Sequence, residues 1–236
     1  MFNIILQGFG LCNRLRVLFS YYYYIVKEKK DKLNIVWIVD EQCNGFFLDY
    51  FEPLPNVEFY RDNSNNFPNN YKGKKGVTAE PHPKYALTKF NGIFKELIPK
   101  PYLMDKINHN LKLLDNNFVA MHIRHTDNIR NTINKNININ TPFLKKHFDF
   151  FDKYIKLNFN IYLATDNKNI QDIFYDKYPN NFKTNKNINE VTGLRHSTLE
   201  NAIIDIFTCS YSKDFIYNHS RSSFRETICE LIKYHS

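Results

Sequence analysis

Three short segments of the sequence carry residue types suited to an anionic ligand. The first, residues 7–15 (QGFGLCNRL), separates an apolar run from a helical pattern. Glycines such as Gly8 and Gly10 let the backbone approach a ligand closely, and the N–H groups at a helix N-terminus attract anions. Asn13 stands where a dinucleotide-binding loop has its third glycine, so the pattern is not G-x-G-x-x-G. The segment is therefore a candidate ligand loop, with a purely structural tight turn as the alternative.

The second segment, residues 121–127 (MHIRHTD), ends a strand-like apolar run. Alternation along a strand separates an apolar face from a second face that carries His122 and Arg124. In open α/β sheets, ligands bind at the carboxyl ends of such strands. The guanidinium of Arg124 matches a diphosphate and could offset the charge that builds on a departing nucleotide. A surface arginine paired with Asp127 is the alternative.

The third segment, residues 197–224, contains two expected helix starts. Ser197 and Ser223 each stand three residues before a glutamate, as in a capping box. On the first helix Asp205 flanks the apolar stripe, where its carboxylate could accept hydrogen bonds from a nucleobase edge or simply face solvent. The second box places Ser222 and Ser223 at a helix N-terminus directly after a strand, a geometry that binds phosphate, although ordinary capping explains Ser223 equally well.

The elements that would position these segments alternate between strands and helices. In the first half, hydrophobic periodicity predicts strands over 2–6, 33–39 and 57–60, with helices from residue 11 onward and over 46–51. It also predicts helices over 85–97 and 102–114, on either side of residues 99–101. In the second half it predicts strands over 118–124, 160–164 and 214–217, and helices over 142–157, 169–178, 198–211 and 223–234. Residues 61–84 and 131–140 are predicted to be loops.

This order predicts an α/β protein with parallel sheets and right-handed crossovers. The Pro99-Lys100-Pro101 sequence is a natural hinge between two successive α/β series. We therefore expect two Rossmann-like domains that face each other across a cleft.

Composition narrows the function classes. Hydrophobic residues make up 43% and aromatic residues 16% of the 236 residues, which predicts a folded, soluble chain. The 32 basic and 24 acidic residues leave a charge of +8, which suits an anionic partner but is often only a solvated face. The four cysteines form no C-x-x-C pair, so neither a zinc site nor a disulfide framework is expected. With no recognisable signal peptide or transmembrane segment, a cytoplasmic location is predicted.

The sequence motifs of several enzyme classes are missing. No D-x-D triplet occurs, which argues against a glycosyltransferase that holds its nucleotide sugar through a divalent ion. The sequence also lacks the G-x-x-x-x-G-K-[ST], G-x-S-x-G and H-E-x-x-H patterns, so a P-loop ATPase, a serine hydrolase of that type and a zinc protease are not expected.

Taken together, the segments resemble the fucosyltransferase superfamily, which includes α1,6-, α1,2- and protein O-fucosyltransferases and bacterial Nod-factor fucosyltransferases. Residues 8–15 are similar to its G-G-x-G-N-R-L loop, and residues 122–127 to its H-x-R-R-x-D motif. Residues 162–166 are similar to its strand ending in A-T-D. Residues 201–210 and 222–224 resemble its A-x-x-D-x-x-x-x-S followed by S-S-F. The motifs occur in order and span most of the chain.

The resemblance implies a GT-B type fold, in which residues 1–100 form the acceptor-side Rossmann-like domain and residues 101–236 the domain that binds the nucleotide sugar. It implies an inverting transfer of fucose from GDP-fucose to a hydroxyl of a glycan or protein. No metal or other cofactor would be needed. The implied partners are thus a nucleotide-sugar donor and a glycan or glycoprotein acceptor, with no nucleic acid.

The same resemblance implies a role for individual residues. Arg124 would hold the β-phosphate, His122 and Asp205 would contact guanine, and Ser222 and Ser223 would support the diphosphate. The remaining donor-side and catalytic candidates are Gly10, Asn13, Arg14, Asp127, Thr165, Asp166 and Phe224.

Within that second group, Asn13 and Arg14 would lie across the cleft near phosphate and acceptor, and Asn13 and Asp127 join Arg124 as catalytic candidates. Asp127 would act as the general base or only orient Arg124.

Two departures from the family pattern affect the donor. Cys12 replaces the glycine before the Asn, and His125 replaces the second arginine. A different nucleotide sugar on the same fold therefore stays an alternative. A second alternative, which rests on charge alone, is a non-catalytic basic module that binds a nucleotide or nucleic acid.

Overall fold

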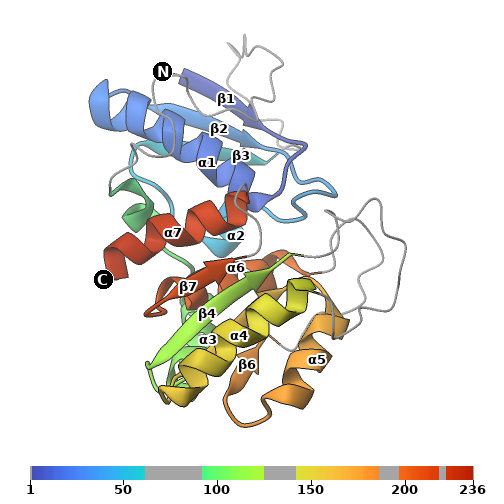
Figure 1. The fold of residues 1–236 in the computed structure, drawn as a ribbon. Helices are drawn as coiled ribbons and strands as arrows, with labels where there is room; N and C mark the ends of the chain where they lie inside the picture. The colour runs from blue at the N-terminus through green and yellow to red at the C-terminus, as the bar shows by residue number, and fades with distance from the viewer. Residues whose placement is uncertain (1, 62–91, 125–141, 186–196, 218–221, 236) are drawn as a thin grey trace. The chain divides into compact units, whose positions relative to one another are not determined.

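The computed structural model describes residues 2–61, 92–124, 142–185, 197–217 and 222–235. The chain divides into two compact units (Figure 1). The first unit contains Met1–Met104 and Cys229–Tyr234, and the second contains Asp105–Ile228 and His235–Ser236. Each unit contains one parallel β-sheet.

The sheet of the first unit has the strand order β1-β2-β3. Its strands are β1 (Phe2–Leu6), β2 (Leu33–Trp37) and β3 (Val57–Arg61). The main helix, α1 (Leu11–Tyr21), continues into a π-helix, η1 (Tyr22–Glu28). The unit also contains α2 (Phe47–Tyr50) and a 3₁₀ turn, η3 (Ile93–Glu96). The three strands and the start of α1 lie where the sequence predicts them.

Helix α1 forms because its apolar residues recur on one face. All members of that stripe are buried: Leu11, Leu15, Leu18, Tyr22 and Ile25. Gly10 is the N-cap residue, and its carbonyl accepts the backbone N–H groups of Asn13 and Arg14 at 3.1 and 3.2 Å. The glycine loop therefore leads directly from the carboxyl end of β1 into the first turn of the helix.

The sheet of the second unit has the order β6-β5-β4-β7. Its strands are β4 (Phe118–Ile123), β5 (Asn160–Thr165), β6 (Phe182–Thr184) and β7 (Phe215–Tyr217). The other helices in the described ranges are α3 (Pro101–Leu113), α4 (Pro142–Lys156), α5 (Lys168–Lys177), α6 (Leu199–Ser210) and α7 (Ser223–His235). The short strand β6 is an element that periodicity did not reveal, because three residues are too few to show alternation.

The two faces of this sheet differ as the alternation predicts. One face packs against α4 and α5 and carries the apolar cluster built on Val119, Met121 and Ile123. The opposite face carries His122 and Tyr162, which α6 approaches through a side-chain hydrogen bond to Tyr162. A polar group on the second face is therefore covered by a helix rather than by solvent.

Both predicted N-cap residues are displaced by one position. Thr198, not Ser197, is the N-cap of α6, because its side chain accepts the backbone N–H of Asn201 at 3.1 Å. At α7 the Oγ of Ser222, not that of Ser223, accepts the backbone N–H of Arg225 at 3.4 Å. A neighbouring hydroxyl can cap equally well, so the choice depends on where the preceding backbone turns.

Some expectations lie wholly or partly outside the described residues. The predicted loop at 131–140 does so wholly, and of the loop at 61–84 only Arg61, the end of β3, is described. Of the helix predicted over 85–97, the described part is the single 3₁₀ turn η3. No helix in the described part of the chain is both long and apolar enough to cross a bilayer.

Candidate functional site

The carboxyl ends of β4 and β5 bring two of the predicted segments together in the second unit. Ile123 pairs in register with Thr165, so Arg124 and Asp166 follow at the ends of neighbouring strands. Thr165 is buried, and its Oγ1 accepts the backbone N–H of Asn167 at 3.3 Å. Arg124 and Asp166 are half-buried. Parallel strands thus deliver a guanidinium and a carboxylate to one sheet edge, where ligands of such folds bind.

His122 ties this edge to the start of α7. Its side chain is only 6% exposed, and its ring stacks on the ring of Phe224 with centroids 4.4 Å apart and an interplanar angle of 26°. Tyr217 of β7 pairs in register with His122, and the guanidinium of Arg225 lies 4.1 Å from the centroid of the Tyr217 ring. These contacts hold the N-terminus of α7 beside the carboxyl end of β4.

The N-terminus of α7 is built by Ser222 and Ser223. Ser222 is buried, and its carbonyl accepts the N–H of Glu226 at 3.0 Å while its Oγ caps Arg225. The carbonyl of Ser223 accepts the hydroxyl of Thr227 at 2.9 Å. The Ser222 hydroxyl oxygen is therefore used for capping. What this helix start offers an anion is its array of first-turn N–H groups and its dipole.

Asp205 lies on α6 and is buried against the sheet. The residue is 7% exposed, and its Oδ1 accepts the Tyr162 hydroxyl at 2.6 Å. Burial raises the pKa of Asp205 from 3.8 to about 7, although hydrogen bonds from Tyr162 and Asn185 act to lower it. The alternative that Asp205 merely faces solvent is therefore wrong, because α6 is buried on nearly every side.

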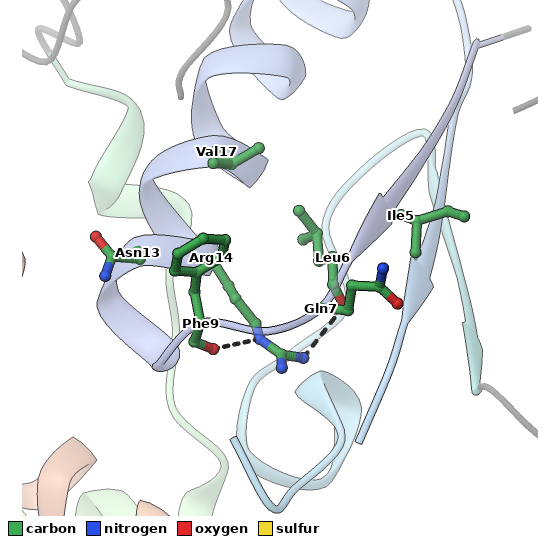
Figure 2. Close-up of a pocket in the computed structure, with 7 residues that line it drawn as sticks. All are labelled: Ile5, Leu6, Gln7, Phe9, Asn13, Arg14 and Val17. Carbon is green, nitrogen blue, oxygen red and sulfur yellow. Dashed lines mark hydrogen bonds between the residues drawn. The ribbon is translucent and has the colours of Figure 1, made fainter. Parts of the chain in front are cut away.

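Arg14 stabilises the glycine loop of the first unit from within. The side chain is only 1% exposed, and its Nε donates to the carbonyl of Phe9 at 2.7 Å. Nη1 donates to the carbonyls of Leu6 and Ile38, and Nη2 donates to Asp40 Oδ2 at 2.7 Å. Figure 2 shows the guanidinium turned toward the loop carbonyls. At least four of its five N–H donors are thus engaged inside this unit.

Asp40, just beyond β2, completes this arrangement. Its Oδ2 also accepts the backbone N–H of Gly8 at 2.7 Å, and its Oδ1 accepts those of Gln42 and Cys43 at 2.9 and 3.0 Å. Burial acts to raise the pKa of Asp40, but the Gly8 N–H and the Arg14 charge outweigh it, so the pKa is lowered. A charged pair therefore fixes the loop to the end of the neighbouring strand.

The loop borders a small pocket in the first unit (Figure 2). The pocket has about 190 Å³ of empty space, which includes open solvent, and is lined by Ile5, Leu6, Gln7, Phe9, Asn13, Arg14 and Val17. Gly8 has φ +70°, a left-handed conformation that favours glycine. Gly10 has φ −66° and needs no such freedom. The half-buried Asn13 is one of the residues that line the pocket, whereas Arg14 is used to hold the loop.

The described residues thus place the sequence candidates in two groups. The second unit contains His122, Arg124, Thr165, Asp166, Asp205, Ser222, Ser223 and Phe224, and the first unit contains Gly10, Asn13 and Arg14. Asp127 and His125 lie outside the described residues. Within the described ranges, no three His, Cys, Asp or Glu side chains are grouped so that they could hold a metal ion.

Sequence reasoning missed two residues of these groups, Asp40 and Tyr162. Asp40 follows a strand-like apolar run, and Tyr162 lies within one. Parallel strands bring each of these positions to a neighbouring loop or helix. The available signal was a polar group, a carboxylate or a hydroxyl, at the end of an otherwise apolar run or within it.

Comparison with known proteins identifies the fold. No protein-family model and no curated protein sequence matches the chain. Among solved structures, the chain is similar to the NodZ α-1,6-fucosyltransferase soaked with GDP-fucose, with a TM-score of 0.63, 14% identity, and coverage of 98% of this chain and 92% of the other.

Two further NodZ structures agree with this match. The enzyme co-crystallised with GDP gives a TM-score of 0.63 at 14% identity, covering 97% and 91% of the two chains. The fucosyltransferase NodZ from Bradyrhizobium gives a TM-score of 0.59 at 13% identity, covering 96% and 91%. The chain therefore has an α/β fold with parallel sheets that matches the GT-B fold of the NodZ fucosyltransferases, the fold class that its motifs predicted.

Proposed function

We propose that this protein is an inverting, metal-independent glycosyltransferase that moves fucose from GDP-fucose to a hydroxyl of a glycan or protein acceptor. The observation that carries the proposal is the convergence of several second-unit candidates at one sheet edge of a fold shared with fucosyltransferases: His122, Arg124, Thr165, Asp166 and Phe224. The His122–Phe224 stack joins the ends of two motifs that are far apart in sequence. The alternatives, a purely structural tight turn at residues 7–15 and a surface role for Arg124, would not require that convergence.

The base of the donor would be recognised by Asp205 and His122. An ionised carboxylate only accepts hydrogen bonds, and the Watson–Crick edge of guanine offers two adjacent N–H donors, N1–H and the 2-amino group. Tyr162 and Asn185 use part of the acceptor capacity of Asp205, which leaves room for two donors from a base. This favours a GDP-sugar over uridine, thymidine, cytidine or adenosine diphosphate sugars.

Arg124 and the N-terminus of α7 would serve the diphosphate. In the transfer, the acceptor oxygen forms a bond to the anomeric carbon as the bond from that carbon to the β-phosphate oxygen breaks. Negative charge then builds on departing GDP, and a guanidinium and a helix N-terminus both stabilise it. The acceptor proton passes to a base, for which Asp127 is the candidate.

The first test is a thermal-melt panel with GDP, UDP, dTDP, CDP and ADP, each with and without EDTA. A nucleotide at 100 times its Kd stabilises by about 2.7 kcal/mol, which shifts Tm by about 5–10 °C for a chain of this size. We expect a shift with GDP alone that EDTA leaves unchanged. A shift with another nucleotide would indicate a different nucleotide-sugar donor. No shift with any nucleotide would favour a non-catalytic protein.

The second test is Arg124→Ala, with Lys213→Ala as the matched control. Lys213 precedes β7 at the opposite end of the sheet, and its Nζ donates to Asn117 Oδ1 at 2.8 Å, so its removal changes the net charge equally. We expect GDP release from GDP-fucose to fall about 100-fold or more in Arg124→Ala and to stay near wild type in Lys213→Ala. Full activity in a folded Arg124→Ala protein would refute the proposed role.

Inversion is tested separately by the anomeric configuration of the product. Attack on the face opposite the leaving GDP converts a β-linked donor sugar into an α-linked product. We expect NMR of the product from a screened acceptor to show only the α-anomer, and a β-linked product would show retention instead.

A further inference from the structure

A chain of hydrogen bonds ends at Asp205 in the second unit. The Nδ2 of Asn110 on α3 donates to Thr208 Oγ1 on α6 at 3.3 Å. The Thr208 hydroxyl in turn donates to the Tyr162 oxygen, and the Tyr162 hydroxyl donates to Asp205 Oδ1 at 2.6 Å. Thr208 and Tyr162 are completely buried. The chain therefore connects two helices and one strand, and its inner members Thr208 and Tyr162 are shielded from water.

The donors and acceptors of this chain follow one another. The Nδ2 of Asn110 donates to Thr208, whose own hydroxyl donates to the oxygen of Tyr162. Tyr162 has one proton, which then points to Asp205. Asp205 is thereby held as an acceptor in one rotamer, with Asn185 as a second donor to the carboxylate.

This arrangement costs stability, which argues against a merely structural role. The sheet face around Tyr162 also carries the small apolar residues Ala120 and Ala164. A buried carboxylate is usually less favourable than an apolar side chain of similar size, and the raised pKa of Asp205 reflects that desolvation. Costly buried polar groups occur where function requires them.

We propose that Tyr162 is a positioning residue that, backed by Thr208, orients the Asp205 carboxylate toward the base of the bound nucleotide and so sets the preference for guanine. The inference rests on the proposed function, because it assumes that Asp205 meets the base of the donor. Tyr162 itself acts through Asp205. Its hydroxyl is therefore expected to affect base discrimination rather than diphosphate binding.

The test compares the Kd values of GDP and IDP by calorimetry for the wild type, Tyr162→Phe and a matched control, Tyr178→Phe. IDP lacks only the 2-amino group that a correctly oriented carboxylate would accept. Tyr178 is also buried in the second unit and donates to an aspartate, Asp152 Oδ1, at 2.7 Å, but it belongs to the apolar cluster on the opposite sheet face. The control thus removes the same atom from another tyrosine–aspartate pair, one whose carboxylate is more exposed.

We expect the wild type to bind GDP about tenfold or more tightly than IDP. In Tyr162→Phe, GDP binding should weaken about tenfold, the value of one hydrogen bond to a charged group, and the GDP/IDP ratio should fall toward one. Tyr178→Phe should keep the wild-type ratio. Thr208→Val is the second variant, because it removes the donor behind Tyr162 and should lower the ratio to a smaller extent.

The outcomes separate this inference from the proposed function. An unchanged GDP/IDP ratio in folded Tyr162→Phe or Thr208→Val, with the wild type binding GDP, would overturn the role of Tyr162 and leave the donor proposal standing. Equal loss of the ratio in Tyr178→Phe would assign the effect to general destabilisation. A wild type that binds no GDP would refute the donor proposal and this inference with it.

Discussion

Replacing Asp205 by Asn should stabilise the free protein, and more so as the pH rises. In the folded protein the pKa of Asp205 is raised from 3.8 to about 7, chiefly by burial. Between these values the folded state holds a proton that the unfolded state releases. Unfolding therefore becomes more favourable as the pH rises through this window, and the full cost is reached above about pH 7.

The magnitude follows from the two pKa values of Asp205. Each pH unit between them corresponds to 1.36 kcal/mol, so the gap from 3.8 to about 7 corresponds to about 4 kcal/mol at pH 8. Asn has no such cost and keeps an oxygen that can accept the hydroxyl of Tyr162. Its amide group must still find acceptors, so we expect a net gain of about 2–4 kcal/mol at pH 8 that vanishes near pH 4.

Urea unfolding of the wild type and Asp205→Asn between pH 4 and pH 8 measures this difference. Circular dichroism should be used, because Trp37, the single tryptophan, lies in the first unit and its fluorescence follows that unit. Asp152→Asn is the control: Asp152 also accepts a tyrosine hydroxyl, but its side chain is 45% exposed, so its removal relieves little burial. Parallel pH profiles for the wild type and Asp205→Asn would refute the reasoning.

Three further predictions concern the loop and the helix start. Arg14→Lys should destabilise the first unit by about 3 kcal/mol in urea unfolding followed by Trp37 fluorescence, because one ammonium cannot serve the carbonyls and the carboxylate that the guanidinium serves; a loss below about 1 kcal/mol would contradict it. Gly8→Ala should cost about 1 kcal/mol in the same assay, since a Cβ there meets no atom within 4 Å and only the φ of +70° is unfavourable, and Gly8→Asn should cost less. Ser222→Ala should lower stability by about 1 kcal/mol by circular dichroism through loss of the N-cap, with Ser223→Ala as the neutral neighbour; equal losses in the two variants would restore Ser223 as the cap.

Local periodicity was enough to predict most of the elements and one sheet face. The spacing of Leu11, Leu15 and Leu18 predicted the buried face of α1, and the alternation in β4 predicted which side chains join the apolar cluster. The motif residues could also be placed at strand ends and helix starts. These features depend on neighbours in sequence, and the side-chain period of a helix or strand is set by its backbone geometry.

The pairing of polar side chains was decided by the tertiary structure. The sequence placed Arg14 and Asp205 in candidate motifs. It did not reveal that Arg14 is held by Asp40, 26 residues away, or that Asp205 is held by Tyr162, 43 residues away. The one-residue displacement of each helix cap belongs to the same class. A polar group can take any donor or acceptor that the fold brings within about 3 Å, and a one-dimensional pattern does not record that distance. The sequence by itself therefore determined the α/β fold class and the candidate residues, whereas packing decided which polar side chains pair with one another and which hold the loops in place.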